Sequence, residues 1–413
     1  MQEDKKILPH VELIDNRVFI LRSNDYLSSH LVALGMDDEF VLEESGNLED
    51  LDKWIKQKED WIFGYLSYDL KNKIEKLETR HPNKTGVNLA HFICPKAVFS
   101  VDEAGVHIYK SLPECDERFI LSWVKKFLSL KEESTLETID LIAAQNKEHY
   151  LKSVYQLKNH IHSGDIYEIN YCQEFYSNQK LKSPFNTWMR LNEKTTAPFA
   201  AYFQINDLYL LCGSPERYLK RLGTRVTSQP IKGTIRRSSD ATRDQELKDE
   251  LHESLKERTE NVMIVDLVRN DLSRSAERGS VKVDKQFELI TFKTVHHLVS
   301  TISAQIKSEV SFVDLIKDTF PMGSMTGAPK IKAMQLSDQY ESSARGIYSG
   351  SVGYIEPNGN FDFNVVIRTV VYNSSEQYIS SHVGGAITAM CDPEEEYDEC
   401  LLKIRAVVEA LGR

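Results

Sequence analysis

The sequence is poor in cysteine and has no long apolar run. Six cysteines occur in 413 residues, without a CxxC pair or a His/Cys cluster, which argues against a structural zinc site and a disulfide framework and is typical of a reducing cytoplasm. No stretch approaches the roughly 20 apolar residues of a membrane helix, and the N-terminal residues lead into no signal-like apolar segment. We therefore predict a soluble, cytoplasmic protein with no membrane partner.

Positive charge is also in short supply. The chain has 51 Lys and Arg against 62 Asp and Glu, a formal charge of −11, and no Lys/Arg-rich run. This balance argues against nucleic acid and anionic membranes as partners, since both require a basic surface. An anionic substrate would have to be met by a few local cations. With 41% hydrophobic and 27% charged residues, the composition is that of an ordinary globular protein.

The chain divides into two parts by its patterning. Residues 1–140 are predicted to form a sheet-rich region of short β-like runs, and a polar connection is expected at 131–146. Residues 146–413 are predicted to form a catalytic domain that opens with a helix capped by Asn146. Further expected elements are a long charged helix near 241–275, strands around 347–356, 362–373 and 377–389, and a last helix over 393–411. The order predicts an α+β protein.

Two Glu-x-x-Glu sequences lie in predicted helices. They pair Glu257 with Glu260 and Glu396 with Glu399. A spacing of three residues puts both carboxylates of a pair on one helix face, where they repel unless a cation lies between them. Carboxylates without nearby His or Cys suit magnesium better than zinc. A solvated acidic face is the alternative, although the apolar run after Glu260 favours burial, and Lys403 lies one turn beyond Glu399.

A strand-end carboxylate and a lysine in a predicted loop form the second candidate pair. Glu216 follows an apolar strand and Pro215, and Lys232 stands between Pro230-Ile231 and Gly233. A buried carboxyl with a raised pKa can act as a general acid, and a desolvated lysine can act as a nucleophile. Taken alone, the Lys232 sequence also fits a surface turn.

A glycine-rich turn and an isolated arginine complete the candidates. Residues 320–330 place Gly323 and Gly327 before a helix that begins near Pro329, and free N–H groups there could bind a carboxylate or simply form a turn. The GxxxxGK[ST] pattern of a nucleotide-binding loop is absent. Arg368, predicted within a β-branched strand, needs an anionic partner, and a bidentate carboxylate suits it best.

Together these segments resemble the chorismate-utilising enzymes, the family of anthranilate, aminodeoxychorismate, isochorismate and salicylate synthases. The resemblance covers about residues 146–413 in order, from Ser214-Pro215-Glu216 through the Lys232 segment, the run from Glu260 to Asp271 and the turn before Lys330 to the helix of Glu396 and Glu399. It implies an α+β fold of the anthranilate synthase component I type, with large antiparallel β-sheets packed as a sandwich with flanking helices.

The resemblance also implies roles for individual residues. Glu260 and Glu399 match magnesium ligands, Glu257 and Glu396 match residues that support them, and the Mg²⁺ would hold the ring carboxylate of chorismate. The remaining positions match residues that contact the substrate: Gly233, Thr234, His297, Ser324, Tyr348, Arg368, Gly384, Gly385 and Lys403.

The residue at position 232 separates the branches of the family. Members that make anthranilate tend to have Ala there, whereas aminodeoxychorismate synthases have Lys, which attacks carbon 2 as the hydroxyl leaves carbon 4. The resemblance implies that Lys232 is this nucleophile and that Glu216 matches the general acid that helps the hydroxyl leave. Ammonia then adds at carbon 4 and expels the lysine, giving a precursor of 4-aminobenzoate and folate. Isochorismate and salicylate synthases have a water-activating lysine where this chain has Glu168, and Gln is commoner there in the aminodeoxychorismate branch. The alternatives are anthranilate synthase component I or a non-catalytic homologue that binds a metabolite.

Two partners follow from the same resemblance. The sequence has no GxCxG nucleophile turn of a glutaminase, so a separate glutamine amidotransferase subunit is expected to supply ammonia. Nothing in the sequence resembles a pyridoxal-phosphate lyase, so we also expect the downstream aminodeoxychorismate lyase to be another protein.

Overall fold

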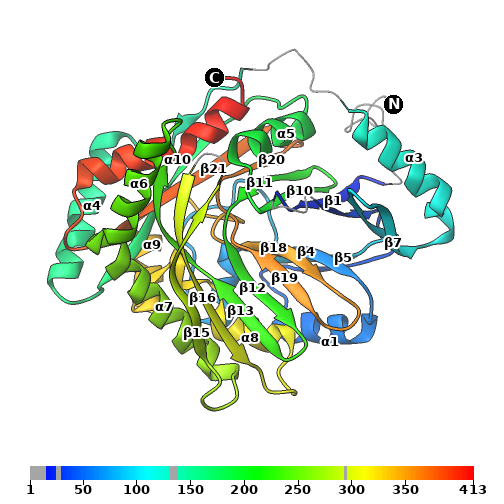
Figure 1. Ribbon diagram of the computed structural model, residues 1–413, viewed down its shortest axis with the longest axis horizontal. Coiled ribbons are helices and arrows are strands. Elements are labelled where there is room, and N and C mark those ends of the chain that lie inside the picture. The colour runs from blue at the N-terminus through cyan, green and yellow to red at the C-terminus, as the bar shows by residue number, and fades with distance from the viewer. Residues whose placement is uncertain (1–14, 25–28, 131–137, 293–294) are drawn as a thin grey trace.

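The computed structural model describes residues 15–24, 29–130, 138–292 and 295–413, which form two large antiparallel sheets flanked by helices (Figure 1). The eleven-stranded sheet runs, in spatial order, β17 (Gly327–Ala328), β9 (Glu168–Ser177), β21 (Tyr378–Ile387), β20 (Thr369–Asn373), β11 (Leu208–Ser214), β10 (Phe199–Ile205), β1 (Arg17–Arg22), β2 (His30–Leu34), β6 (Ala97–Asp102) and β7 (Gly105–Ser111), with β8 (Ile142–Ala143) beside β9.

The second sheet has ten strands. Its order is β14 (Ile231–Arg236), β16 (Val295–Gln305), β13 (Arg225–Gln229), β12 (Arg217–Leu222), β19 (Phe361–Asn364), β18 (Ser351–Ile355), β4 (Ile62–Leu66), β5 (Ala90–Cys94) and β3 (Asp38–Leu42), with β15 (Lys282–Thr291) beside β16. Both sheets take strands from residues 1–140 and from residues 146–413. The expected division into two regions remains a prediction, and residues 131–137 of the expected connection lie outside the described residues.

Helices cover the outer faces of the sheets. They are α1 (Leu48–Lys58), α2 (Lys71–Ile74), α3 (Glu117–Leu128), α4 (Lys147–His162), α5 (Pro184–Thr195), α6 (Ala241–Glu253), α7 (Leu255–Ser275), α8 (Phe312–Thr319), α9 (Lys330–Tyr340) and α10 (Pro393–Ala410). Short 3₁₀ turns are η1 (Tyr68–Leu70), η2 (Pro113–Cys115) and η3 (Gly323–Met325). None of the helices in the described part of the chain is long and apolar enough to span a membrane.

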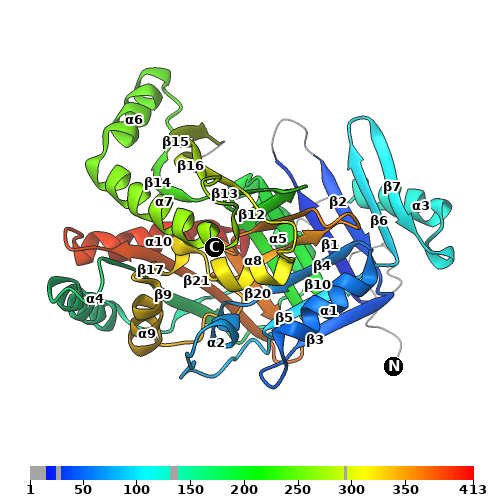
Figure 2. The ribbon, with the colours of Figure 1, turned by 90° about the horizontal axis from the view of Figure 1, so that it is seen from below.

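Three apolar clusters hold these layers together. Phe19, Phe63 and Phe203 lie in the cluster between the two sheets. A second cluster joins the eleven-stranded sheet to α3, α4, α5 and α10, and a third joins the ten-stranded sheet to α1, α7 and α8. Figure 2 shows α8 and α1 together on the outside of the ten-stranded sheet. Strands within a sheet, such as β4 and β5, are covered on both faces and are buried along their whole length, whereas the outer strands β7 and β15 are largely exposed.

The local sequence accounts for several helix boundaries. The Asn146 side chain accepts a hydrogen bond from the His149 N–H and caps α4, as predicted, while Tyr150, Val154 and Leu157 point into the core. The prediction of one long helix at 241–275 is wrong. Ser254 leaves helical geometry with ψ of 112° and its side chain accepts from the Glu257 N–H, so a new helix, α7, begins there.

Candidate active site

Lys232 lies in β14, an end strand of the ten-stranded sheet, and not in the loop that its sequence suggests. The register of β14 against β16 shifts between Ile231 and Thr234, and Gly233 takes a φ of +87° that few other residues tolerate. The Lys232 Nζ lies 2.6 Å from Glu168 Oε1 and 4.0 Å from Glu260 Oε2. Burial lowers the pKa of Lys232, but the charges of Glu168 and Glu260 outweigh burial and raise it well above its usual value.

Glu216 lies where the chain leaves the eleven-stranded sheet after β11 and enters the other sheet at β12. The side chain is buried and its Oε1 accepts a hydrogen bond of 2.7 Å from the Ser324 hydroxyl in η3. Burial raises the pKa of Glu216 to about 7, although the Ser324 hydrogen bond and the charge of Lys232 oppose this shift. A carboxyl with this pKa holds a proton in a substantial fraction of molecules at neutral pH.

The return crossing, from β19 to β20, contains Arg368. The prediction that Arg368 lies within a strand is wrong, because the chain leaves β19 after Asn364 and Arg368 takes a left-handed φ of 53°. The two crossings are bonded together, since the Val365 N–H donates to the Glu216 carbonyl at 3.0 Å. Within the described ranges, the Arg368 guanidinium has no hydrogen-bond or ion-pair partner, which leaves it able to bind an anion.

His297 and Thr234 face each other across the pairing of β14 with β16. The Thr234 Oγ1 lies 2.7 Å from Nδ1 of the buried His297 ring. Burial, reinforced by the charge of Arg368, lowers the pKa of His297 to about 3. The ring is therefore neutral at physiological pH and can donate or accept a single hydrogen bond at each nitrogen.

The four glutamates lie on α7 and α10, as predicted. Glu260 is buried, its Oε1 has no hydrogen-bond partner among the described residues, and burial raises its pKa to about 7. Burial also raises the pKa of Glu257, opposed by the charge of Lys256 and reinforced by that of Glu399. The two α10 carboxylates form ion pairs with lysines. Lys256 Nζ lies 3.0 Å from Glu396, and Lys403 Nζ lies 2.5 Å from Glu399.

The carboxylates fit magnesium in chemistry, and two of them, Glu396 and Glu399, are paired with lysines. No three His, Cys, Asp or Glu side chains of residues 15–24, 29–130, 138–292 and 295–413 form a group that could hold a metal ion. Carboxylate oxygens are nonetheless the ligands that Mg²⁺ prefers, and the unpartnered buried oxygen of Glu260 is costly without a cation. The magnesium site remains a prediction.

Gly385 allows β21 to lie close to α10, and Gly384 allows it to lie close to β9. A Cβ on Gly385 would lie 2.8 Å from Glu396 Oε2, and one on Gly384 would lie 2.5 Å from the Cys172 sulfur. The Gly384 carbonyl accepts a hydrogen bond of 2.9 Å from Lys403. Tyr348, just before β18, stacks on the ring of His382 at 5.4 Å between ring centroids.

Sequence reasoning placed most of these residues in one site but missed the ion pair of Lys232 with Glu168. The only signal in the sequence is Glu168 itself, where the resemblance to isochorismate and salicylate synthases leads one to expect a lysine. Glu168 lies on β9 of one sheet and Lys232 on β14 of the other. A contact between residues 64 apart in two sheets depends on how the sheets pack, which local patterns do not predict.

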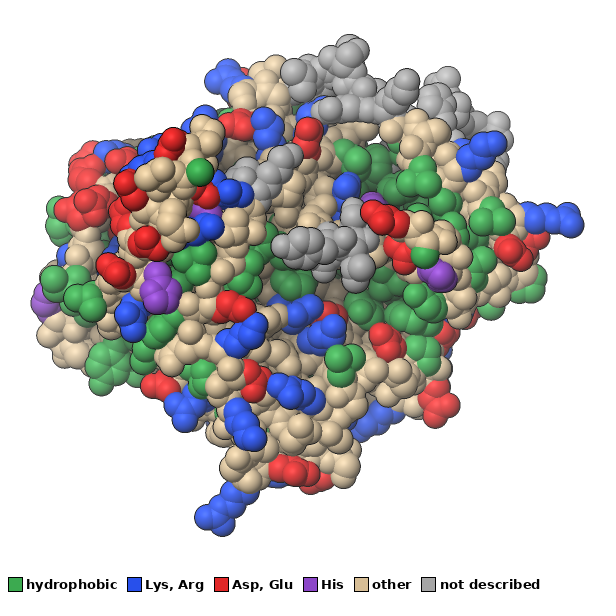
Figure 3. Space-filling model, in the orientation of Figure 1, with side chains coloured by type: hydrophobic (Ala, Val, Ile, Leu, Met, Phe, Trp, Pro, Cys, Tyr) green, Lys and Arg blue, Asp and Glu red, His purple; other side chains and the backbone are tan. Residues whose placement is uncertain are grey.

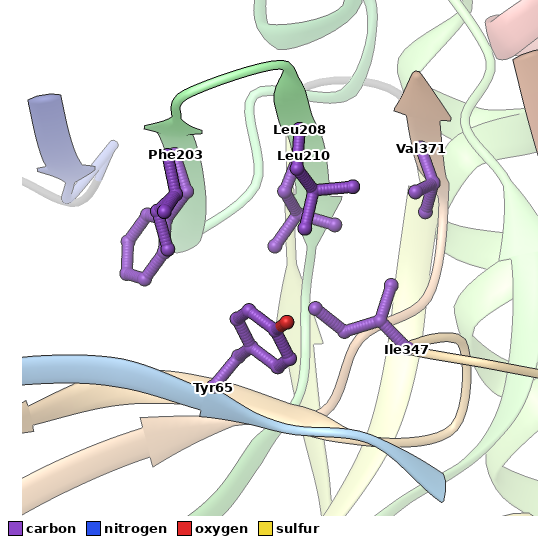
Figure 4. A pocket seen from close by; sticks show the side chains of 7 residues that line it. Tyr65, Phe203, Leu208, Leu210, Ile347 and Val371 are labelled. Atoms are coloured by element: carbon purple, nitrogen blue, oxygen red, sulfur yellow. The ribbon is translucent and has the colours of Figure 1, made fainter. Parts of the chain in front are cut away.

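One face of the surface and a pocket in the apolar interior both differ from the candidate active site in the charges they present. On the face in Figure 3, acidic and basic side chains are interspersed. A small pocket between the sheets is lined by apolar residues, six of which are labelled in Figure 4: Tyr65, Phe203, Leu208, Leu210, Ile347 and Val371. Its lining contains no charged side chain, and the Tyr65 hydroxyl accepts from the Asn88 N–H at 3.2 Å. The pocket suits neither an anionic substrate nor a metal.

The two-sheet sandwich is the fold of anthranilate synthase component I, as predicted. The crystal structure of that protein from Streptococcus pneumoniae TIGR4 superposes with a TM-score of 0.79 at 24% identity, covering 99% of this chain and 95% of the other. Residues 29–409 match the model of the family described as chorismate binding enzyme. The chain belongs to the chorismate binding enzymes, which confirms the resemblance inferred from the motifs.

Two curated relatives are more similar in sequence. The chloroplastic aminodeoxychorismate synthase of Arabidopsis thaliana is 37% identical over 372 residues, which is 84% of this chain and 40% of that protein. Aminodeoxychorismate synthase component 1 of Escherichia coli K12 is 35% identical over 307 residues, 74% of this chain and 67% of that protein. The chain thus spans less than half the length of the plant relative.

Proposed function

We propose that this protein is an aminodeoxychorismate synthase component I, which aminates chorismate at carbon 4 with ammonia and magnesium. The observation that carries the proposal is Lys232, a buried lysine held between Glu168 and Glu260 in a chorismate-binding fold. The names of the relatives from Arabidopsis and Escherichia coli support the same reaction. Lys232 is the residue that distinguishes this reaction from the formation of anthranilate.

Glu216 is the proposed general acid. With a pKa raised to about 7 by burial, its carboxyl can give a proton to the hydroxyl that leaves carbon 4. The Ser324 hydroxyl fixes the orientation of this carboxyl through its 2.7 Å hydrogen bond. The charges of Lys232 and Arg368 both act on the pKa of Glu216, which supports a site shared by acid, nucleophile and substrate-binding cation.

Lys232 is the proposed nucleophile at carbon 2. The raised pKa means that its amine is protonated in the resting protein, so the proton must leave before attack. Attack at carbon 2 shifts the ring double bonds and breaks the bond from carbon 4 to the hydroxyl, which leaves as water with the proton of Glu216. Ammonia then adds at carbon 4, the double bonds shift back, and the bond from carbon 2 to the Lys232 nitrogen breaks, which returns the free amine. The product has an amino group where the hydroxyl was, and the enolpyruvyl group is retained.

Arg368, Lys403 and the neutral His297 are proposed to hold the substrate. Chorismate has two carboxylates, and the free guanidinium of Arg368 can bind one of them through two parallel hydrogen bonds. Lys403, on α10, is anchored to β21 by its hydrogen bond to the Gly384 carbonyl. Magnesium, bound by Glu260 and Glu399 with support from Glu257 and Glu396, would neutralise the ring carboxylate and withdraw electrons from the diene.

We propose that a separate glutamine amidotransferase subunit supplies ammonia and that a separate lyase completes 4-aminobenzoate. The Escherichia coli relative is named component 1, and this name implies a second component. Residues 1–140 are proposed to be a sheet-rich region packed on a catalytic domain of residues 146–413. Because free ammonium can replace the glutaminase, the chain can be tested alone.

The test is to incubate the purified chain with chorismate, magnesium and ammonium and to identify the product by mass spectrometry. We expect 4-amino-4-deoxychorismate. Accumulation of anthranilate would assign the chain to anthranilate synthase component I, and the absence of any product would favour a non-catalytic metabolite-binding protein. A chorismate-derived adduct on the Lys232 peptide during turnover would identify both the nucleophile and the reaction.

A further inference from the structure

The ion pair between Lys232 and Glu168 joins the two sheets inside the site. Glu168 belongs to β9 of the eleven-stranded sheet and Lys232 to β14 of the ten-stranded sheet. The Glu168 side chain is 1% exposed and the Lys232 side chain 11% exposed, so both charges are largely removed from water. A buried pair at 2.6 Å is far more sensitive to the loss of one partner than a surface pair.

Lys232 depends on this contact for its position because its own strand holds it loosely. Among the described residues, β14 is an end strand that pairs with β16 alone, although α6 and α7 also contact it, and the register shift beside Gly233 interrupts the strand pairing at Lys232. The lysine stem has four rotatable bonds. Glu168 makes the hydrogen bond to Nζ, whereas Glu260 at 4.0 Å is beyond hydrogen-bond range.

Glu168, by contrast, is held firmly. Its backbone pairs with Ala328 of β17, and the next residues of β9 pair with β21 up to Ser177. Tyr167, one residue earlier, donates its N–H to the Ala328 carbonyl at 2.7 Å. The acceptor therefore lies on a strand that is paired on both sides, whereas the donor lies on an end strand, and the acceptor determines where the Nζ lies.

We propose that Glu168 is the positioning residue of Lys232, holding the amine at one point of the site so that it meets carbon 2 of the substrate. This inference rests on the proposed function for its catalytic consequence, but the pairing itself does not. The ion pair costs stability, because the second carboxylate oxygen of Glu168, Oε2, is buried and has no hydrogen-bond partner in the described part of the chain. A purely structural role would be served as well by an apolar pair.

The experiment compares Glu168→Ala, Glu168→Gln and the control Glu174→Gln, using ammonium as the nitrogen source. Glu174 is a buried carboxylate on the same face of β9, bonded to Tyr378 and Ser380 and not to Lys232. We expect Glu168→Ala to lower kcat about 100-fold with KM for chorismate within about threefold, since small misplacements of a reacting group cost this much. Glu168→Gln retains an acceptor oxygen and should recover kcat to within about tenfold of the wild type, while Glu174→Gln should stay within about twofold.

A second measurement needs no chorismate. The rate of reductive methylation of Lys232 by formaldehyde and cyanoborohydride, followed on the Lys232 peptide by mass spectrometry, should rise at least about threefold in Glu168→Ala and Glu168→Gln and stay unchanged in Glu174→Gln, because an amine held in an ion pair is less reactive. An unchanged labelling rate in both Glu168 variants, or an unchanged kcat in Glu168→Ala, overturns the proposal. If Glu168→Ala does not fold, the labelling of Glu168→Gln alone decides. A wild type that labels as expected yet does not aminate chorismate refutes the proposed function and leaves the pairing intact.

Discussion

The hydroxyl of Ser324 lies 2.7 Å from Oε1 of Glu216, and both side chains are buried where the glycine-rich turn meets the crossing between the two sheets. The serine donates the only hydrogen bond to this carboxyl that comes from a side chain of the described residues. Glu216 keeps a raised pKa in spite of this bond, because burial is the larger influence. The Ser324 hydrogen bond therefore orients the Glu216 carboxyl but does not bring its pKa down to the usual value.

Replacing Glu216 by Gln should remove the acid and keep the shape of the site. Gln can still accept the Ser324 hydrogen bond but has no proton to give to the leaving hydroxyl. We expect kcat to fall by about 10² to 10⁴, with little change in KM for chorismate. Steady-state kinetics with ammonium measures this, and Ser324→Ala, which leaves the carboxyl in place, should lose much less activity. Equal losses in the two variants would argue against acid catalysis by Glu216.

The same carboxyl should make stability depend on pH. A carboxyl with a pKa raised from 4.5 to about 7 binds its proton more tightly in the folded protein, so its contribution is fully present below pH 4.5 and is lost as pH rises through about 7. By pH 8 this lowers the free energy of unfolding by roughly 3 kcal/mol at most. Urea unfolding of the wild type and Glu216→Gln at pH 5 and pH 8 tests this. The free energy of unfolding of Glu216→Gln minus that of the wild type should be larger at pH 8 than at pH 5.

The sequence predicted those features of the site that depend on local patterns. The cap of α4 at Asn146, the pairs of glutamates on α7 and α10 and the helix after Pro329 all follow from residues within a few positions of one another. The apolar run that follows Glu260 predicts its burial, and the side chain is buried.

What the sequence could not predict depends on contacts between distant segments. Arg368 has strand-like neighbours, yet the chain must leave β19 to reach the other sheet, and this topology overrides the local preference. Lys232 is flanked by Pro and Gly, which are typical of a turn, but pairing with β16 holds it in a strand. The bond from Lys232 to Glu168 requires the packing of two sheets.

Lys232→Ala should abolish amination while leaving chorismate binding. The substrate is held by other groups, notably Arg368, so the dissociation constant should change by less than about tenfold, whereas the rate should fall on the order of 10³ or more when the nucleophile is absent. Fluorescence titration measures binding and product formation measures the rate. Full activity in this variant would mean that Lys232 forms no covalent bond to the substrate.

Arg345 should be a main determinant of stability. Its buried guanidinium is paired with Glu341 at 2.5 Å and donates to the carbonyls of Asn170 and Met325, which ties β9 to the glycine-rich turn. Arg345→Met leaves the Glu341 carboxylate buried without its partner, and we expect a loss of about 3–5 kcal/mol in the free energy of unfolding. Urea denaturation measures this, with the exposed pair of Arg243 and Glu246 as control. Arg243→Met should change the stability by less than about 1 kcal/mol.

Removal of magnesium should stop the reaction, and Glu260 should be the residue on which metal affinity depends most. We expect EDTA to abolish amination and added Mg²⁺ to restore it. Glu260→Gln removes the charge of a buried carboxylate whose Oε1 has no partner among the described residues, so calorimetry should give Mg²⁺ binding at least about tenfold weaker. Glu395→Gln, an exposed position in the first turn of α10, is the matched control and should bind Mg²⁺ as the wild type does. Equal affinities in all three proteins would place the metal elsewhere, and Glu260 would then serve only as a second anion beside Lys232, 4.0 Å from its Nζ.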